Sequence, residues 1–94
     1  MTVGEPPAVI IGRTLVEARF WRAHYEAAYP ELATAKELSS FQDTRALAGL
    51  RVGRIFVAPD ADKAPKFYEV LTVVRHMQAK TNVFEEPIFL GSRL

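Results

Sequence analysis

The sequence of 94 residues contains no cysteine, which excludes disulfide bonds, thiol nucleophiles and thiolate metal sites. A secreted chain this small usually needs disulfides for stability, so their absence favours a reducing compartment. No apolar run approaches the roughly 20 residues that span a bilayer. The first seven residues carry an acid and two prolines, where a signal peptide has basic residues and an apolar run. We therefore expect a cytoplasmic protein with no membrane partner.

An excess of charge of one sign is also missing. Twelve Lys and Arg residues against eleven Asp and Glu residues give a formal net charge of +1. A nucleic-acid-binding protein of this size is normally markedly basic, because phosphate contacts supply much of its affinity. Arg45, Arg51 and Arg54 form a local basic group that can contact phosphates. The overall balance nevertheless favours a solvated loop face and makes a nucleic-acid partner the least favoured of three functions.

The composition that is present is typical of one soluble globular domain. Hydrophobic residues make up 49% of the chain and charged residues 24%. We expect residues 1–7 to be a flexible lead-in, residues 8–90 a single α/β domain and residues 91–94 a tail. A domain of this size buries only about 60–70% of its unfolded surface. A large apolar face left uncovered would therefore indicate a partner or a second copy.

Two short segments, residues 8–11 and residues 54–58 with their apolar run Ile55-Phe56-Val57, predict buried strands of a sheet. The first run ends at Gly12, which breaks the pattern before the next element. A further strand within residues 83–90 is expected at the sheet edge, because Pro87 cannot donate a ladder hydrogen bond. We expect the strands at residues 8–11 and 54–58 to be adjacent at the centre of the sheet.

Two amphipathic helices are predicted between these strands. One covers residues 15–29, with Thr14 as its N-cap and Glu17 completing a capping box, and it ends before a proline. The other covers residues 65–80, with Asp62 as its expected cap. The apolar positions of this second helix form one arc, made of Phe67, Val70, Leu71, Val73, Val74 and Met77.

Residues 30–50 are harder to interpret. Residues 32–38 alternate loosely, as in a strand, but residues 31–38 are also rich in good helix formers. Residues 42–47 predict a short helix, and Gly49 suits the left-handed position that often ends one. The order of elements predicts an α/β fold, a small sandwich with a short, mostly parallel sheet and two main amphipathic helices.

Two loops follow the central strands at the edge where open α/β sheets bind ligands. Arg13 and Thr14 follow the first strand and can hold a phosphate at a helix N-terminus, or form an ordinary capped turn. Asp60 and Asp62 follow the second and can bind Mg²⁺, or form a solvated turn. The segment Ile55-Phe56-Val57-Ala58-Pro59-Asp60-Ala61-Asp62 resembles the aspartate motif of Toprim nuclease and primase domains. That family also has a glutamate in the loop after its first strand, where this chain has Gly12-Arg13-Thr14.

The first helix has more apolar surface than one sheet can cover. Val16, Phe20, Ala23 and Ala27 form one stripe, and Ala18, Trp21, Tyr25 and Ala28 form a second. Between the two stripes Glu17 and His24 are aligned, and we expect them to form a hydrogen-bonded pair. Either other parts of the chain cover the Trp21 side, or aromatic residues form a surface for a partner or for self-association. The residues of that expected interaction surface are Phe20, Trp21, Tyr25 and Tyr29.

A resemblance adds to this interpretation. The stretch Thr44-Arg45-Ala46-Leu47-Ala48-Gly49-Leu50-Arg51-Val52-Gly53-Arg54-Ile55-Phe56-Val57 is similar to segments of small α/β accessory proteins of actinobacteriophages. The resemblance implies expression in the cytoplasm of a bacterial host and a function in binding. We expect a non-enzymatic interaction protein that binds a host protein or itself, without cofactor, metal or catalytic residues. The alternative is a phosphate- or Mg²⁺-binding enzyme remnant of Toprim-like or Rossmann-like type.

Overall fold

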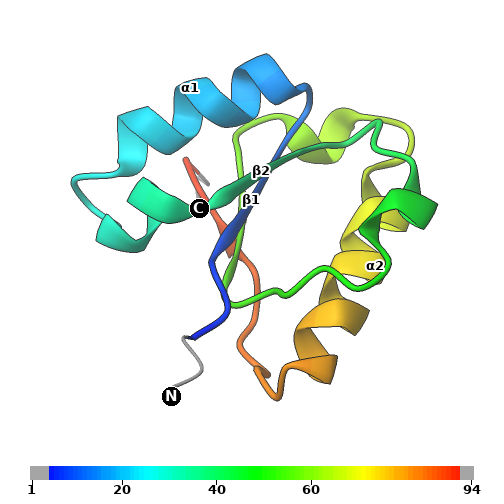
Figure 1. Ribbon diagram of the computed structural model, residues 1–94. Coiled ribbons are helices and arrows are strands. Elements are labelled where there is room, and N and C mark those ends of the chain that lie inside the picture. Colours follow the sequence, from blue (N-terminus) through cyan, green and yellow to red (C-terminus); the bar gives the residue numbers. More distant parts are fainter. Residues whose placement is uncertain (1–4, 92–94) are drawn as a thin grey trace.

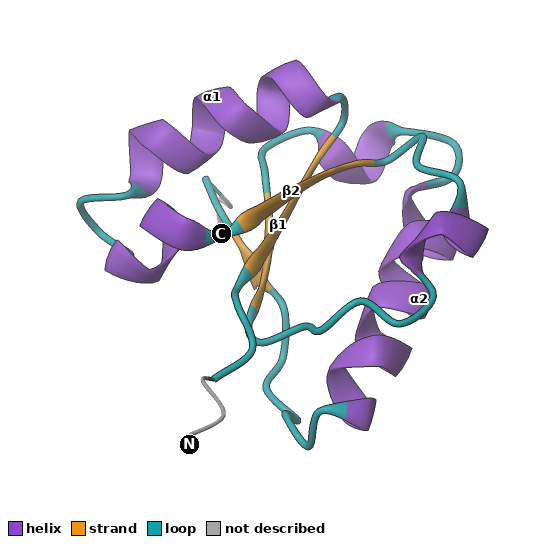
Figure 2. Cartoon of the chain, in the orientation of Figure 1, coloured by secondary structure: helices purple, strands orange, loops and turns teal. Residues whose placement is uncertain are grey.

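The computed structural model describes residues 5–91 and arranges them as a parallel sheet between two α-helices (Figures 1 and 2). Three short 3₁₀ helices, at Pro30–Thr34, Thr44–Leu47 and Ala61–Lys63, lie in the connections of this described part. The strands are β1 (Val9–Gly12), β2 (Lys36–Ser39), β3 (Ile55–Val57) and β4 (Ile88–Phe89), and the α-helices are α1 (Leu15–Tyr25) and α2 (Phe67–Lys80).

The four strands are all parallel and lie in the order β2-β1-β3-β4. In this register Ile11 of β1 lies between Leu38 of β2 and Val57 of β3. All residues of β1 and β3 are buried, as expected for strands covered on both faces. The predicted α/β class and the adjacency of the two central strands are confirmed.

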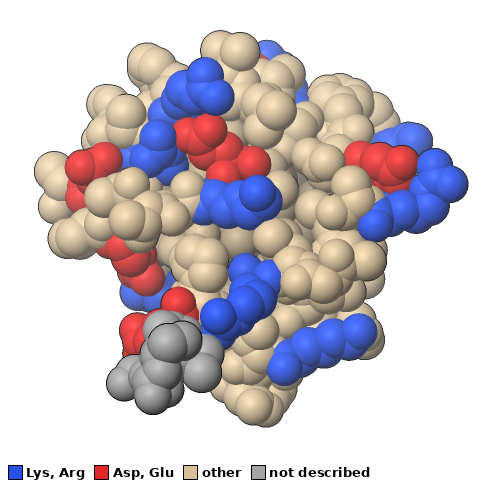
Figure 3. Space-filling view, in the orientation of Figure 1, with Lys and Arg blue, Asp and Glu red and all other residues tan. Residues whose placement is uncertain are grey.

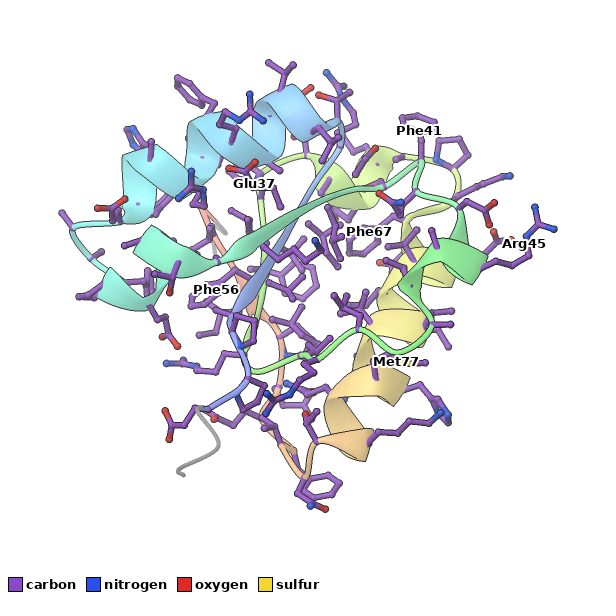
Figure 4. The ribbon with its side chains drawn as sticks, viewed as in Figure 1. Glu37, Phe41, Arg45, Phe56, Phe67 and Met77 are labelled. Atoms are coloured by element: carbon purple, nitrogen blue, oxygen red, sulfur yellow. The ribbon has the colours of Figure 1, made fainter. Side chains whose placement is uncertain are left out.

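The helices cover opposite faces of the sheet, so the fold has three layers (Figure 1). Successive strand residues point to opposite faces. Phe56 packs with Ala18 in the layer under α1, whereas its neighbours in β3 pack with Phe67 in the layer under α2. The labelled rings of Phe56 and Phe67 in Figure 4 mark the two layers. Phe67 and Val70 are fully buried and Val73 is partly buried, which confirms the predicted apolar arc of this helix.

The turn from β1 into α1 brings helix and sheet into close contact at Gly12. A Cβ atom at this position would lie 2.4 Å from the backbone nitrogen of Ala18 and 2.7 Å from its Cα. The Thr14 hydroxyl accepts a hydrogen bond from the backbone N–H of Glu17 at 3.2 Å, which confirms the predicted N-cap. The Glu17 carboxylate binds Arg13 instead of completing the predicted capping box.

The first helix ends earlier than predicted. It stops at Tyr25 rather than at residue 29, and the backbone N–H groups of Ala28 and Tyr29 both donate to the Tyr25 carbonyl as the chain turns away. Pro30 disfavours helical geometry in the residue before it, and Tyr29 is accordingly more extended, with φ −132° and ψ 85°. Neither alternative for residues 31–38 is right as stated, because a 3₁₀ helix from Pro30 is followed by β2.

Smaller differences occur in the second half. Gly49 has φ of +79°, as predicted. The second helix begins at Phe67 rather than at residue 65, and its N-cap is Lys66, which makes no side-chain capping bond, so the prediction that Asp62 caps it is wrong. The last strand is confined to Ile88–Phe89 at the sheet edge.

Parts of the expected terminal segments fall outside the described residues, namely 1–4 of the lead-in and 92–94 of the tail. The described end of the lead-in lies against the segment before β3, where the Pro7 carbonyl accepts a hydrogen bond from the Gly53 N–H at 2.8 Å. No helix within residues 5–91 has the length and apolar character needed to cross a membrane.

Candidate functional site

The strand order places two sequence-predicted loops together at the carboxyl edge of the sheet. The chain runs outward from β1 to β2 and then returns to β3 on the other side of β1, so the strand order reverses between β1 and β3. In open α/β sheets such a reversal opens a crevice where ligands bind. Arg13 and Thr14 follow β1 on this edge, and Asp60 and Asp62 follow β3.

Arg13 and Asp60 in these loops are each held in a local ion pair. Arg13 donates to the Glu17 carboxylate at 3.0 Å, so its charge is already balanced. Asp60 adopts a left-handed conformation with φ of 67° and forms an ion pair with Lys63 at 3.0 Å. Asp62 is exposed. In the described part of the chain no group of three or more His, Asp or Glu side chains is arranged to hold a metal ion.

Ser40 fills the space between the two loops. Its hydroxyl is fully buried and lies 2.9 Å from the Gly12 carbonyl and 3.4 Å from the Ala61 carbonyl. The Ser40 backbone N–H also donates to the Gly12 carbonyl at 2.8 Å. A buried hydroxyl satisfied in this way is a structural bridge. The sequence gives no signal for this role, since Ser40 looks there like part of a loop break.

Two cavities lie at opposite ends of the strands. The smaller, of about 190 Å³, is lined by Asp60, Asp62 and Phe89 beside the ends of β3 and β4. The larger, of about 340 Å³, is at the amino ends and is lined by Arg54 together with Glu5, Glu31 and Glu85 and by apolar and backbone groups.

The three arginines of the predicted basic group do not form one basic surface. Arg54 forms ion pairs with Glu31 at 2.8 Å and Glu85 at 3.3 Å, and its guanidinium lies over the Phe56 ring. Arg45 binds Asp43, and its hydrogen bonds from side chain and backbone hold the pKa of that carboxyl below its usual range. Arg51 is exposed, in the same segment before β3 that carries Arg54. Over the upper part of the face seen in Figure 3, basic and acidic side chains lie next to one another.

The outward side of α1 carries a row of exposed apolar residues. Val16 is 76% exposed and Phe20 59%, and Ala23 and Ala27 are exposed as well. Their spacing of four, three and four residues places them along one side of the helix and of the turn that follows it. We call these four residues the outer stripe. The helix forms the outer surface of the molecule in Figure 1, and none of the elements drawn there lies over its outward side.

The other apolar stripe of α1 faces the sheet. Trp21 and Tyr25 are half-buried and pack against the layer beneath, and Tyr29 contacts the Phe56 ring at a centroid distance of 5.2 Å. Leu90, from the C-terminal segment, belongs to the same layer, whereas the second helix covers the opposite face of the sheet. The expected interaction residues are therefore divided, with Phe20 facing outward and the other three packed inward.

His24 joins the aromatic residues at the border between the two stripes. Its ring stacks on Phe20 at 6.0 Å and meets Trp21 edge-on at 5.3 Å. The side chain of His24 is exposed and Glu17 binds Arg13 instead, so the expected Glu17–His24 pair is not found.

Glu37 on β2 fixes the rotation of α1 about its axis. Arg22 donates to its carboxylate at 2.6 Å and also to the backbone carbonyls of the 3₁₀ segment, while Arg19 reaches the same carboxylate at 3.4 Å. Glu37 lies between strand and helix in Figure 4. This residue is missing from the sequence-based prediction, because its partners are 15 and 18 residues away.

Comparison of the chain with protein-family models, with curated proteins and with solved structures found no match. No relative therefore assigns a role to any of these residues. Function is therefore inferred from the exposed outer stripe of α1.

Proposed function

We propose that this chain is a non-enzymatic interaction protein that binds a protein partner through the outer stripe of α1. The observation that carries the proposal is the exposure of Val16 and Phe20 in a continuous row with Ala23 and Ala27. Single exposed apolar side chains are ordinary on protein surfaces. Several on one side of one helix form a patch of the kind that marks binding sites.

The setting of the stripe supports binding at low entropic cost. Trp21 and Tyr25 anchor α1 from below, and the Arg22–Glu37 ion pair at 2.6 Å fixes its orientation. A surface that is already rigid loses little conformational freedom on association. Phe20 packs edge-on against Trp21 at 4.9 Å and stacks on His24, so it presents a supported aromatic face to a partner.

The proposal includes the setting in which the protein acts. The resemblance of residues 44–57 to small actinobacteriophage proteins supports a phage-encoded accessory protein in the cytoplasm of a bacterial host. Its partner is then a host protein or a second copy of the chain. Either partner can cover the outer stripe with a protein surface, and one experiment detects both.

The experiment places a photo-crosslinking benzoylphenylalanine at position 20 in cells that express the chain. Phe84 is the matched control, because it is an equally aromatic, 76% exposed residue outside α1. We expect a covalent adduct from position 20 and none from position 84. The mass of the adduct separates self-association from binding to another protein. Failure of position 20 to give any adduct, in cells and with the purified chain, would overturn the proposal.

A further inference from the structure

The two ends of the outer stripe differ in the size of their side chains and in the charge of the residues beside them. We propose that it binds the same stripe of a second copy of this chain, with the two α1 helices antiparallel about a two-fold axis. This inference rests on the proposed function and names its partner. In such an isologous contact one surface must be complementary to itself in reversed direction.

The sizes of the stripe residues meet this condition. Val16 and Phe20 are large and occupy the first half of the row, whereas Ala23 and Ala27 are small and occupy the second half. Antiparallel packing places the large half of each helix on the small half of the other, so that knobs face holes. Parallel packing would place large on large and leave a gap between the alanines.

The charges beside the stripe select the same arrangement. Arg19 and Glu26 are seven residues apart, so they lie on the same border of the stripe, about 10 Å apart along the axis. When a two-fold axis perpendicular to the helices relates an antiparallel pair, each border lies beside the same border of the second copy, which runs in the opposite direction. Arg19 of one copy then faces Glu26 of the second copy, and this ion pair occurs twice. In a parallel pair the two-fold axis runs along the helices and each border meets the opposite border, so Arg19 and Glu26 would not face each other.

Both groups are available for such a pair. The Arg19 side chain is 71% exposed, and its contact with Glu37 is long, at 3.4 Å, whereas Arg22 binds the same carboxylate at 2.6 Å. Glu26 is exposed, and its side chain makes no hydrogen bond or ion pair within residues 5–91. On the opposite border Arg13 and Glu17 neutralise each other. The border with Arg19 and Glu26 is therefore complementary in charge to its copy, and the border with Arg13 and Glu17 adds no repulsion.

The short length of α1 limits the area that the dimer can bury. Eleven residues form a helix about 16 Å long, so the contact falls below the roughly 1,200 Å² that bounds stable complexes. We therefore expect a weak dimer whose population rises with protein concentration.

The test is sedimentation equilibrium of the purified chain up to its highest soluble concentration. We expect a monomer–dimer equilibrium that Arg19→Glu and Glu26→Arg each weaken about tenfold or more, since each variant makes both pairs repulsive. The double variant Arg19→Glu/Glu26→Arg restores both pairs and should regain the association. Arg75→Glu is the matched charge reversal on α2 and should leave the dimer unchanged. Circular dichroism spectra of all variants serve as the control for folding.

Each result bears on a different part of the inference. Loss in both single variants with recovery in the double variant supports the antiparallel arrangement. A dimer that is insensitive to these charges overturns it. A chain that is monomeric at every concentration overturns self-association, and a crosslink from position 20 to a different protein would in that case leave the proposed function standing.

Discussion

Gly12 is the residue on which the close approach of α1 to the sheet depends. The Cβ atom of an alanine here would lie 2.4 to 2.8 Å from backbone and side-chain atoms of Ala18, so the helix must move. We expect Gly12→Ala to lower the free energy of unfolding by roughly 1–3 kcal/mol through overpacking. Urea denaturation measures this change.

The control is Gly49→Ala, where no atom lies within 4 Å of an added Cβ. Gly49 has φ of +79°, so this variant loses only about 1 kcal/mol through backbone strain. A Gly12→Ala protein as stable as the parent would show that α1 is not packed as closely as described.

At the same scale, the sequence could not determine which apolar stripe of α1 faces the sheet. Both stripes carry an aromatic residue, Phe20 in one and Trp21 in the other, and the two residues are neighbours in the chain. The choice is made by contacts from elsewhere, with Ala18 fitted over Gly12 and Arg22 held by Glu37. These contacts join positions six to fifteen residues apart, and helical periodicity carries no information about them.

Among the elements, α1 is the one whose integrity the proposed interaction needs. Its first turn is capped by the Thr14 hydroxyl, which accepts from the Glu17 N–H at 3.2 Å. We expect Thr14→Ala to lower the free energy of unfolding by about 1 kcal/mol, because that N–H loses its partner. Thr14→Ser keeps the hydroxyl and should stay within about 0.5 kcal/mol of the parent. Equal stabilities of the two variants in thermal denaturation would exclude a capping role.

The elements that the sequence predicted well are those with a local signal. The central strands are continuous apolar runs, and α2 has a single apolar arc. The N-cap of α1 is likewise local, whereas its end at Tyr25 depends on how the following turn leads into Pro30. For residues 30–39 the sequence offered either one helix or one strand. The structure has both, because a 3₁₀ helix is followed by an edge strand.

At the scale of the whole molecule, one short sheet serves two separate apolar layers. Ile10 and Phe56 point into the layer under α1, and Val9 and Ile55 point into the layer under α2. Strands of three or four residues are too short to persist without packing on both faces. At the carboxyl edge Ser40 connects the layers again, because its hydroxyl lies within hydrogen-bond distance of the Gly12 carbonyl at the end of β1 and of the Ala61 carbonyl in the loop after β3. We infer that the two layers unfold together.

Phe67 and Trp21 allow this inference to be tested, because they lie on opposite faces of the sheet and Trp21 is the single tryptophan. We expect Phe67→Leu to lower the free energy of unfolding by roughly 1–2 kcal/mol. In urea titrations the Trp21 fluorescence transition should shift to the same lower midpoint as the circular dichroism transition. Tyr68→Leu, at a 64% exposed neighbour, should change either midpoint little. A tryptophan transition that stays in place while circular dichroism shifts would mean that the α1 layer folds independently of the α2 layer.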